Sequence, residues 1–406
     1  MALWRVRALL SRIPASVTFW QAPRKTAARR WIFNIHFYGG LIAGLLWLVV
    51  GLTGSVIVFV PELRRLEAPG WTRVEPTGQP LALETLWQRV HKGRPADKMA
   101  SIYFDFKPTW AWNFRSVADN GDRIHTFVDQ YRGHLLASVN YNHSLLQWVY
   151  DLHADLLGGQ RGREVNAWFA FALCVVTSGG VLLWWRGCRY WKRGFEYRAA
   201  ASWKRQAWDL HNLGGFCFYL PLLLLSLSGA YFAFQPAFTS VAAMLTGGPA
   251  VIPPPQVAAR NGPRRSLDEI LESARRALPD SAPSMIIFPA NPSEAFSLRM
   301  RRSSDPHRLG LNWVYVDPAS ARVLRVDRFD RQPRGVQLIR LMIPLHYGTI
   351  GGLFTRVLWV VAGLMPGVLF SAALLMWWNR VLSKKRRARK PAAAELRPAA
   401  VSNLPR

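Results

Sequence analysis

Four long apolar stretches constrain the fold of this 406-residue chain more than any other feature. They cover residues 37–60, 167–185, 216–234 and 357–378, and none of them contains a charged side chain. A helix rises about 1.5 Å per residue, so each stretch is long enough to cross a hydrocarbon core of roughly 30 Å. The sequence therefore predicts a membrane protein with four transmembrane α-helices.

The basic residues predict how these helices are oriented. Segments 1–35, 186–210 and 379–406 contain 7, 7 and 9 Lys and Arg against 0, 2 and 1 acidic residues, so they hold 20 of the 28 net positive charges. The long segments 62–164 and 237–355 are more balanced, with 13 basic residues against 12 acidic and 15 against 9. Basic loops resist translocation, so we expect both termini in the cytoplasm. The charge is a topology signal that attracts membrane lipids, and it does not indicate a nucleic-acid partner.

An internal repeat places four histidines at matched positions. His36 and His211 each follow a basic and aromatic segment, and each lies 25 residues before a proline. His153 and His346 each lie 31 residues before a Trp-Trp pair. The offsets are 175 and 193 residues, so a unit of helix, soluble segment and helix occurs twice.

The two soluble segments share a pattern of their own. In the first, a helical periodicity over 81–91 precedes strand-like stretches at 101–106, 111–117 and 124–128. In the second, a helix over 266–278 with a capping box at Ser266 and Glu269 precedes 284–288, 295–301 and 311–316. A Val-Asp turn then begins a strand–turn–strand in both, at 128–136 and 316–324. Two small α+β modules are therefore expected.

These patterns together predict the organisation of the whole chain. Its parts are a cytoplasmic segment (1–35), a first transmembrane helix (36–61), a first periplasmic module (62–152), a second transmembrane helix with a periplasmic extension (153–186), a cytoplasmic loop (187–210), a third transmembrane helix (211–236), a second periplasmic module with a Pro/Gly-rich linker (237–345), a fourth transmembrane helix with a periplasmic extension (346–378) and a basic cytoplasmic tail (379–406).

The chain resembles the PepSY-associated transmembrane proteins, a family that includes siderophore-iron reductases of bacterial inner membranes. The resemblance rests on the basic-aromatic-His starts of the first and third helices, on the Leu-His segments ending in Gly-Gly around His153 and His346, and on the helix-then-strands modules with their Val-Asp turn. It covers nearly the whole chain. It implies a four-helix core that holds b-type haem, with two tandem repeats and two periplasmic α+β PepSY-like modules.

The histidines point to haem independently of that resemblance, because two imidazoles facing each other make a six-coordinate electron-transfer centre. About 37 Å of helix separates His36 from the far end of its own span, so it cannot share an iron with His153. We therefore expect two haems, one between His36 and His211 and one between His153 and His346, and the resemblance implies that both are haem b. Other outer-side histidines are alternative ligands for the second haem: His91, His125, His134, His143 and His307.

Arginines offer matched candidates for the haem propionates. Arg163 and Arg356 each lie ten residues after a histidine of the second expected pair, and either could bind a carboxylate through a bidentate contact. The three cysteines form no Cys-x-x-Cys pair, which excludes an attached c-type haem and a zinc ribbon.

The expected function is that of a haem-dependent ferric reductase in the bacterial inner membrane. It would pass electrons from a cytoplasmic or quinol donor to a periplasmic acceptor. The family resemblance implies that this acceptor is a ferric siderophore, from which Fe(II) is released. Trp110, Trp112 and Arg115 are candidate siderophore contacts. Two alternatives remain open: a quinol-linked haem oxidoreductase with another acceptor, and a non-catalytic PepSY sensor or transport accessory.

Overall fold

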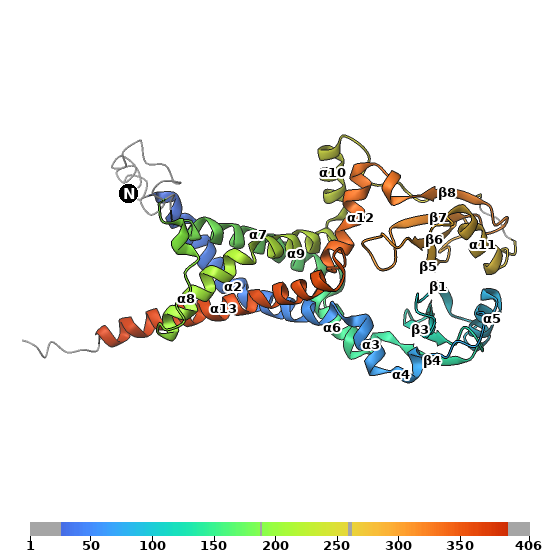
Figure 1. Cartoon of the computed structure of the whole chain (residues 1–406), viewed down its shortest axis with the longest axis horizontal. Coiled ribbons are helices and arrows are strands. Elements are labelled where there is room, and N and C mark those ends of the chain that lie inside the picture. Colours follow the sequence, from blue (N-terminus) through green and yellow to red (C-terminus); the bar gives the residue numbers. More distant parts are fainter. Residues whose placement is uncertain (1–25, 187–188, 259–261, 389–406) are drawn as a thin grey trace, which may run out of the picture. The chain divides into compact units, whose positions relative to one another are not determined.

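Three of the four predicted spans are continuous helices in the computed structural model, which describes residues 26–186, 189–258 and 262–388 (Figure 1). These helices are α2 (Ala27–Ile57), α7 (Gly159–Trp184) and α13 (Gly352–Ala388), and all three are long and apolar enough to cross a membrane. The chain is therefore a multi-pass membrane protein. Residues 1–25 of the predicted cytoplasmic segment and 389–406 of the predicted basic tail lie outside the described residues.

The fourth predicted span is a bent pair of helices instead of one continuous helix. α8 (Trp203–Cys217) and α9 (Tyr219–Tyr231) meet at an angle of 59°. Pro221 follows the break. A proline has no N–H to donate, and its ring clashes with the carbonyl group four residues earlier, which here belongs to Cys217. The helical hydrogen-bond pattern is therefore interrupted at this point.

His153 and His346 lie on short helices that precede the long apolar ones. α6 (Leu145–Asp155) ends two residues after His153, and α12 (Arg334–His346) ends at His346 itself. The predicted periplasmic extensions that begin at these histidines thus contain a break before α7 and α13 start. Between α6 and α7 the chain adopts positive φ at Leu156 (54°), Leu157 (60°) and Gly159 (57°), and left-handed residues end a right-handed helix.

Contacts within the chain divide it into two compact units. The first comprises Met1–Leu48, Val175–Leu220 and Met365–Arg406, and the second comprises Val49–Cys174 and Pro221–Leu364. His36 and His211 belong to the first unit, and His153 and His346 to the second.

The second unit contains one antiparallel sheet of eight strands in the order β4-β3-β2-β1-β5-β6-β7-β8. The strands are β1 (Lys98–Tyr103), β2 (Trp112–Val117), β3 (Arg123–Val128), β4 (Leu135–Asn140), β5 (Ala282–Ile287), β6 (Phe296–Arg301), β7 (Asn312–Val316) and β8 (Val323–Asp327). The first four come from one predicted module and the last four from the other, so each predicted strand is confirmed. The pairing of β1 with β5, which joins the modules edge to edge, was not predicted.

Two matched helices, α5 (Leu83–Gly93) and α11 (Leu267–Ala277), cover one face of this sheet. The core between them and the strands includes Leu86, Phe114, Ile270 and Leu298, none of which is more than 1% exposed. Both helices are those predicted from the sequence, and Ser266 caps α11 by accepting from the Glu269 backbone N–H.

The two helices also cap each other. The Asp268 carboxylate of α11 accepts from the backbone N–H groups of Leu83 and Glu84 at 2.7 and 3.0 Å. The Glu84 carboxylate of α5 accepts in return from the Leu267 N–H at 2.8 Å. Backbone N–H groups at a helix start have no partner within the helix, so each module satisfies the other's free donors.

The second unit also contains three shorter α-helices. They are α3 (Val60–Glu67), α4 (Pro69–Thr72) and α10 (Gln235–Thr246). α10 packs on α12 through a small cluster that includes Tyr231, Ala242 and Ile339.

Candidate functional site

The first histidine pair consists of His36 on α2 and His211 on α8. Their ring centroids are 5.9 Å apart, and the rings are nearly perpendicular, at 86°. The Nδ1 atom of His36 is 2.8 Å from the carbonyl oxygen of Val176, and that of His211 is 2.9 Å from the carbonyl oxygen of Leu369. Val176 and Leu369 are themselves 193 residues apart, so the two hydrogen bonds are repeat-equivalent.

The second histidine pair consists of His153 on α6 and His346 on α12. Their ring centroids are 6.0 Å apart, at an interplanar angle of 40°. The Nδ1 atom of His153 is 2.9 Å from the Val50 carbonyl oxygen, and that of His346 is 3.1 Å from the Ser228 hydroxyl. The structure thus brings together the same two pairs that the repeat predicted.

These contacts determine which ring nitrogen carries the proton. A carbonyl oxygen can only accept, so His36, His211 and His153 donate from Nδ1. The Ser228 hydroxyl donates to the Leu224 carbonyl oxygen at 2.6 Å, and it accepts from His346 in turn. The Nδ1 hydrogen bond orients each ring, and a neutral imidazole with its proton on Nδ1 presents an Nε2 lone pair to a metal ion.

The spacing within each pair fits a metal held between two imidazoles. Bonds from a metal to imidazole nitrogen are about 2 Å long, which puts the centroids of the two rings about 6 Å apart. Among the described residues, no group of three or more His, Cys, Asp or Glu side chains gathers around a common point. A site with two protein ligands suits haem, because the porphyrin supplies the remaining ligands.

Glycines leave room beside three of the four rings. A Cβ atom at Gly180 would lie 3.0 Å from Cε1 of His36, and one at Gly54 would lie 2.7 Å from Cε1 of His153. At Gly229 the corresponding distance to His346 is 3.2 Å. Gly54 and Gly229 are 175 residues apart and hence repeat-equivalent. The sequence alone did not show that these glycines contact histidines.

The predicted propionate arginines already have acidic neighbours. Arg356 makes a bidentate ion pair with Glu62, with both N···O distances 2.7 Å, and it also donates to the Val58 carbonyl oxygen. Arg163 has only a loose contact, 3.9 Å, with Asp155. Arg163 is therefore the freer of the two to bind another carboxylate.

The alternative outer histidines lie in other surroundings. His91 stacks on Trp87 of α5, with centroids 5.0 Å apart. His125 of β3 is buried against Tyr141, and His307 is buried beside Arg299. Burial and neighbouring arginines lower the pKa of His125 to about 2 and that of His307 to about 3. His134 and His143 lie at the two ends of β4, outside the strand itself.

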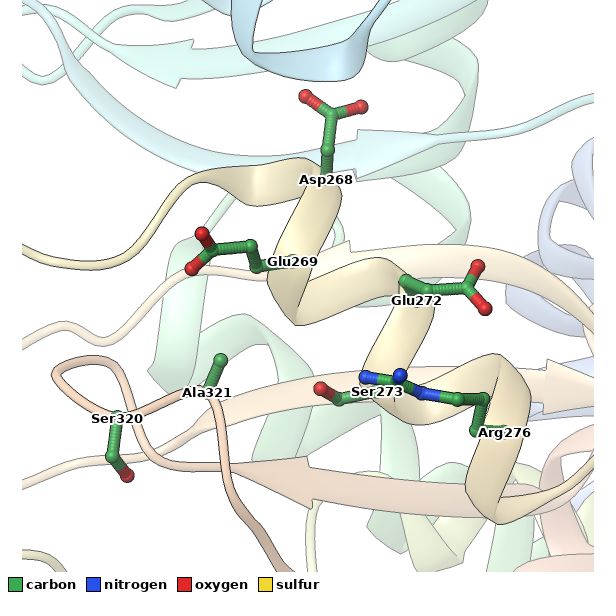
Figure 2. Close-up of a pocket in the computed structure, with 7 residues that line it drawn as sticks. All are labelled: Asp268, Glu269, Glu272, Ser273, Arg276, Ser320 and Ala321. Carbon is green, nitrogen blue, oxygen red and sulfur yellow. The ribbon is translucent and has the colours of Figure 1, made fainter.

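A surface hollow beside α11 holds none of the four paired histidines. Figure 2 shows the residues that line it, which come from α11 and from the turn between β7 and β8: Asp268, Glu269, Glu272, Ser273, Arg276, Ser320 and Ala321. The Asp268 carboxylate caps α5 through two hydrogen bonds, so this side chain has a structural role.

Comparison with known proteins agrees with the resemblance drawn from the motifs. Residues 33–380 match the family model described as the PepSY-associated TM region. No curated protein matches the chain. The matched region includes both histidine pairs and the whole sheet. The chain therefore belongs to the family of proteins with a PepSY-associated transmembrane region.

Proposed function

We propose that this protein is a dihaem b oxidoreductase of the bacterial inner membrane that reduces ferric siderophore iron in the periplasm. The observation that carries the proposal is the arrangement of the histidines: two facing pairs, all four rings held through Nδ1, with ring centroids 5.9 and 6.0 Å apart. Family membership supports an oxidoreductase, and the repeat supports two equivalent sites.

Each pair would hold one haem through the two Nε2 atoms. When bound, haem would supply a centre that accepts and donates single electrons. The protein's contribution is to fix the rings. The carbonyl groups of Val176, Leu369 and Val50 and the hydroxyl of Ser228 each accept from one Nδ1, which orients the imidazole and would leave its Nε2 atom for the iron.

The arginines after the second pair are proposed to bind haem propionates. Arg163 has an exposed guanidinium and only a loose ion pair, so it offers the more accessible contact. Arg356 would have to share its charge between a propionate and Glu62.

The proposed substrate is a ferric siderophore on the periplasmic side, with both chain termini in the cytoplasm. Hard oxygen ligands hold Fe(III) more tightly than Fe(II), so one-electron reduction weakens the chelate and lets Fe(II) leave. The electron enters from a cytoplasmic donor or a quinol.

Anaerobic mixing of dithionite-reduced protein with a ferric siderophore tests this proposal. We expect the haem absorbance to return to its oxidised form while an Fe(II)-specific dye records one Fe(II) for each electron lost. His153→Ala should abolish this reaction, whereas His91→Ala, on α5, should not change it. Reduced protein that stays reduced in the presence of ferric siderophores would refute the proposal.

A further inference from the structure

Two arginines stand at equivalent positions in the two halves of the sheet. Arg115 is the fourth residue of β2, and Arg299 is the fourth residue of β6. Their neighbours Phe114 and Leu298 are fully buried in the core under α5 and α11. Because side chains alternate along a strand, both arginines lie on the opposite face of the sheet.

Both guanidinium groups contact only neutral protein groups. Arg115 lies over the Tyr103 ring, with Cζ 3.6 Å from the ring centroid. Arg299 donates to the Gly310 carbonyl oxygen at 2.9 Å and to Nδ1 of His307 at 3.3 Å. Across the described part of the chain, neither arginine has a carboxylate oxygen within ion-pairing distance.

Two further arginines extend this positive region. Arg64 lies over the Tyr141 ring at 4.0 Å, close enough to Arg115 and Arg308 for their charges to interact. Neither Arg64 nor Arg308 forms an ion pair among the residues described. The Nε atoms of Arg64 and Arg115 are buried without a hydrogen-bond acceptor. We call these four residues, Arg64, Arg115, Arg299 and Arg308, the arginine cluster.

Positive charge exceeds negative charge around the arginine cluster. Asp105 and Glu62 interact with Arg308, but Asp105 pairs with Arg65 and Glu62 with Arg356. Glu67 interacts with Arg64 and Asp305 with Arg299, so these two carboxylates offset part of the charge of the four arginines. The cluster keeps an excess of positive charge within a partly desolvated environment. Burial lowers the pKa of Arg299 to about 10, which still leaves it charged at neutral pH. Desolvating an unpaired charge costs several kcal/mol, so such a cluster is stabilised by an anion.

The cluster also lies close to the second histidine pair. Tyr347 directly follows His346, and its ring centroid is 6.5 Å from that of His307, which accepts from Arg299. The Tyr347 ring lies 6.3 Å from the ring of His346, and 41% of the Tyr347 surface is accessible. The cluster is therefore joined to the candidate redox centre through aromatic and imidazole rings.

We infer that the arginine cluster binds the electron acceptor and that this acceptor is a negatively charged ferric chelate, such as a catecholate or carboxylate complex. Arg115 and Arg299 hold its oxygens through charge-assisted hydrogen bonds, and the accessible Arg308 attracts it from solution. Neutral and cationic chelates bind more weakly, because they leave the arginine charges uncompensated. This inference rests on the proposed function and specifies the class of its substrate.

Binding of a redox-inert chelate tests the inference apart from electron transfer. We would titrate the full-length protein in detergent with the Ga(III) complex of a tricatecholate, and in parallel with the neutral Ga(III) complex of a trihydroxamate. The anionic complex should bind at least tenfold more tightly. Arg115→Gln and Arg299→Gln should each weaken its binding about ten- to hundredfold. Arg276→Gln, on the exposed surface of α11, should leave binding unchanged.

Each contrary result has a definite meaning. Equal affinity for the two complexes, or no binding of the anionic one, overturns the inference. Loss of bound haem from Arg115→Gln and Arg299→Gln, without any chelate binding, also overturns it, because the anion would then be a haem propionate. If these variants do not fold, the unsubstituted protein is titrated with the anionic complex at several salt concentrations. An affinity that does not change with salt concentration overturns the inference as well. Tight anionic binding to protein that fails to reduce ferric chelates refutes the proposed function alone.

Discussion

Replacing Gly54 by alanine should damage the second histidine pair selectively. The new Cβ would lie 2.7 Å from Cε1 and 3.0 Å from Nδ1 of His153. Carbon atoms in contact are normally about 3.5–4.0 Å apart, so the ring must move by about 1 Å or the helix must shift. Both responses strain the hydrogen bond from His153 to the Val50 carbonyl oxygen, now 2.9 Å long.

The magnitude follows from two contributions. Overpacking a tight contact typically costs about 1–3 kcal/mol, and a lost hydrogen bond costs about 0.5–1.5 kcal/mol more. If about 2–4 kcal/mol of this falls on the ligand-bound form, haem affinity at this pair drops by about 30- to 700-fold. The first pair, His36 and His211, should keep its affinity, because Gly54 belongs to the other unit.

Haem content of the purified variant is the assay. Gly54→Ala should retain one low-spin haem per chain where the unchanged protein retains two. Gly40→Ala is the matched control on the same helix, since its Cβ would meet Val176 at an ordinary 4.0 Å. A Gly54→Ala protein with full haem content and an unchanged spectrum would show that His153 does not ligate iron from the position described.

Other consequences of the structure can be tested by single substitutions and by pH. Ser228→Ala removes the acceptor for Nδ1 of His346 and should lower haem affinity at the second pair about 10- to 100-fold, measured by haem transfer to apomyoglobin. Asp268→Ala and Glu84→Ala should each destabilise the sheet by about 0.5–2 kcal/mol in denaturant unfolding, and strictly additive effects would argue against reciprocal capping. Burial, followed by nearby arginines, lowers the pKa of His125 from 6.5 to about 2, so the unfolded chain binds more protons below pH 6.5. Stability should therefore fall by up to about 2 kcal/mol between pH 6.5 and 5, and His125→Gln should flatten this dependence in thermal melts at the two pH values.

Local patterns in the sequence were enough to predict most elements of the sheet. Alternating side chains identified β2 and β6, and helical periodicity identified α5 and α11. The edge pairing of β1 with β5 was not predictable, because an open strand edge presents backbone groups that have no side-chain signature. For the same reason the repeat predicted two separate modules, whereas the structure has one sheet.

The repeat also predicted which histidines face each other, since equivalent residues meet across a pseudo-two-fold axis. It could not identify the groups that accept from Nδ1. Val50, Val176 and Leu369 accept through backbone carbonyl oxygens, and every residue has such an oxygen whatever its side chain. The break after His153 was hidden as well, since Leu156 and Leu157 adopt positive φ without being glycine.

Haem stoichiometry of the detergent-purified protein tests the central claim most directly. The pyridine haemochrome and the oxidised and dithionite-reduced visible spectra should show two low-spin b-type haems per chain. Alanine in place of both His36 and His211 should remove one haem, and alanine in place of both His153 and His346 should remove the other. A chain that purifies folded but without haem would contradict the account and would favour a sensor or transport accessory.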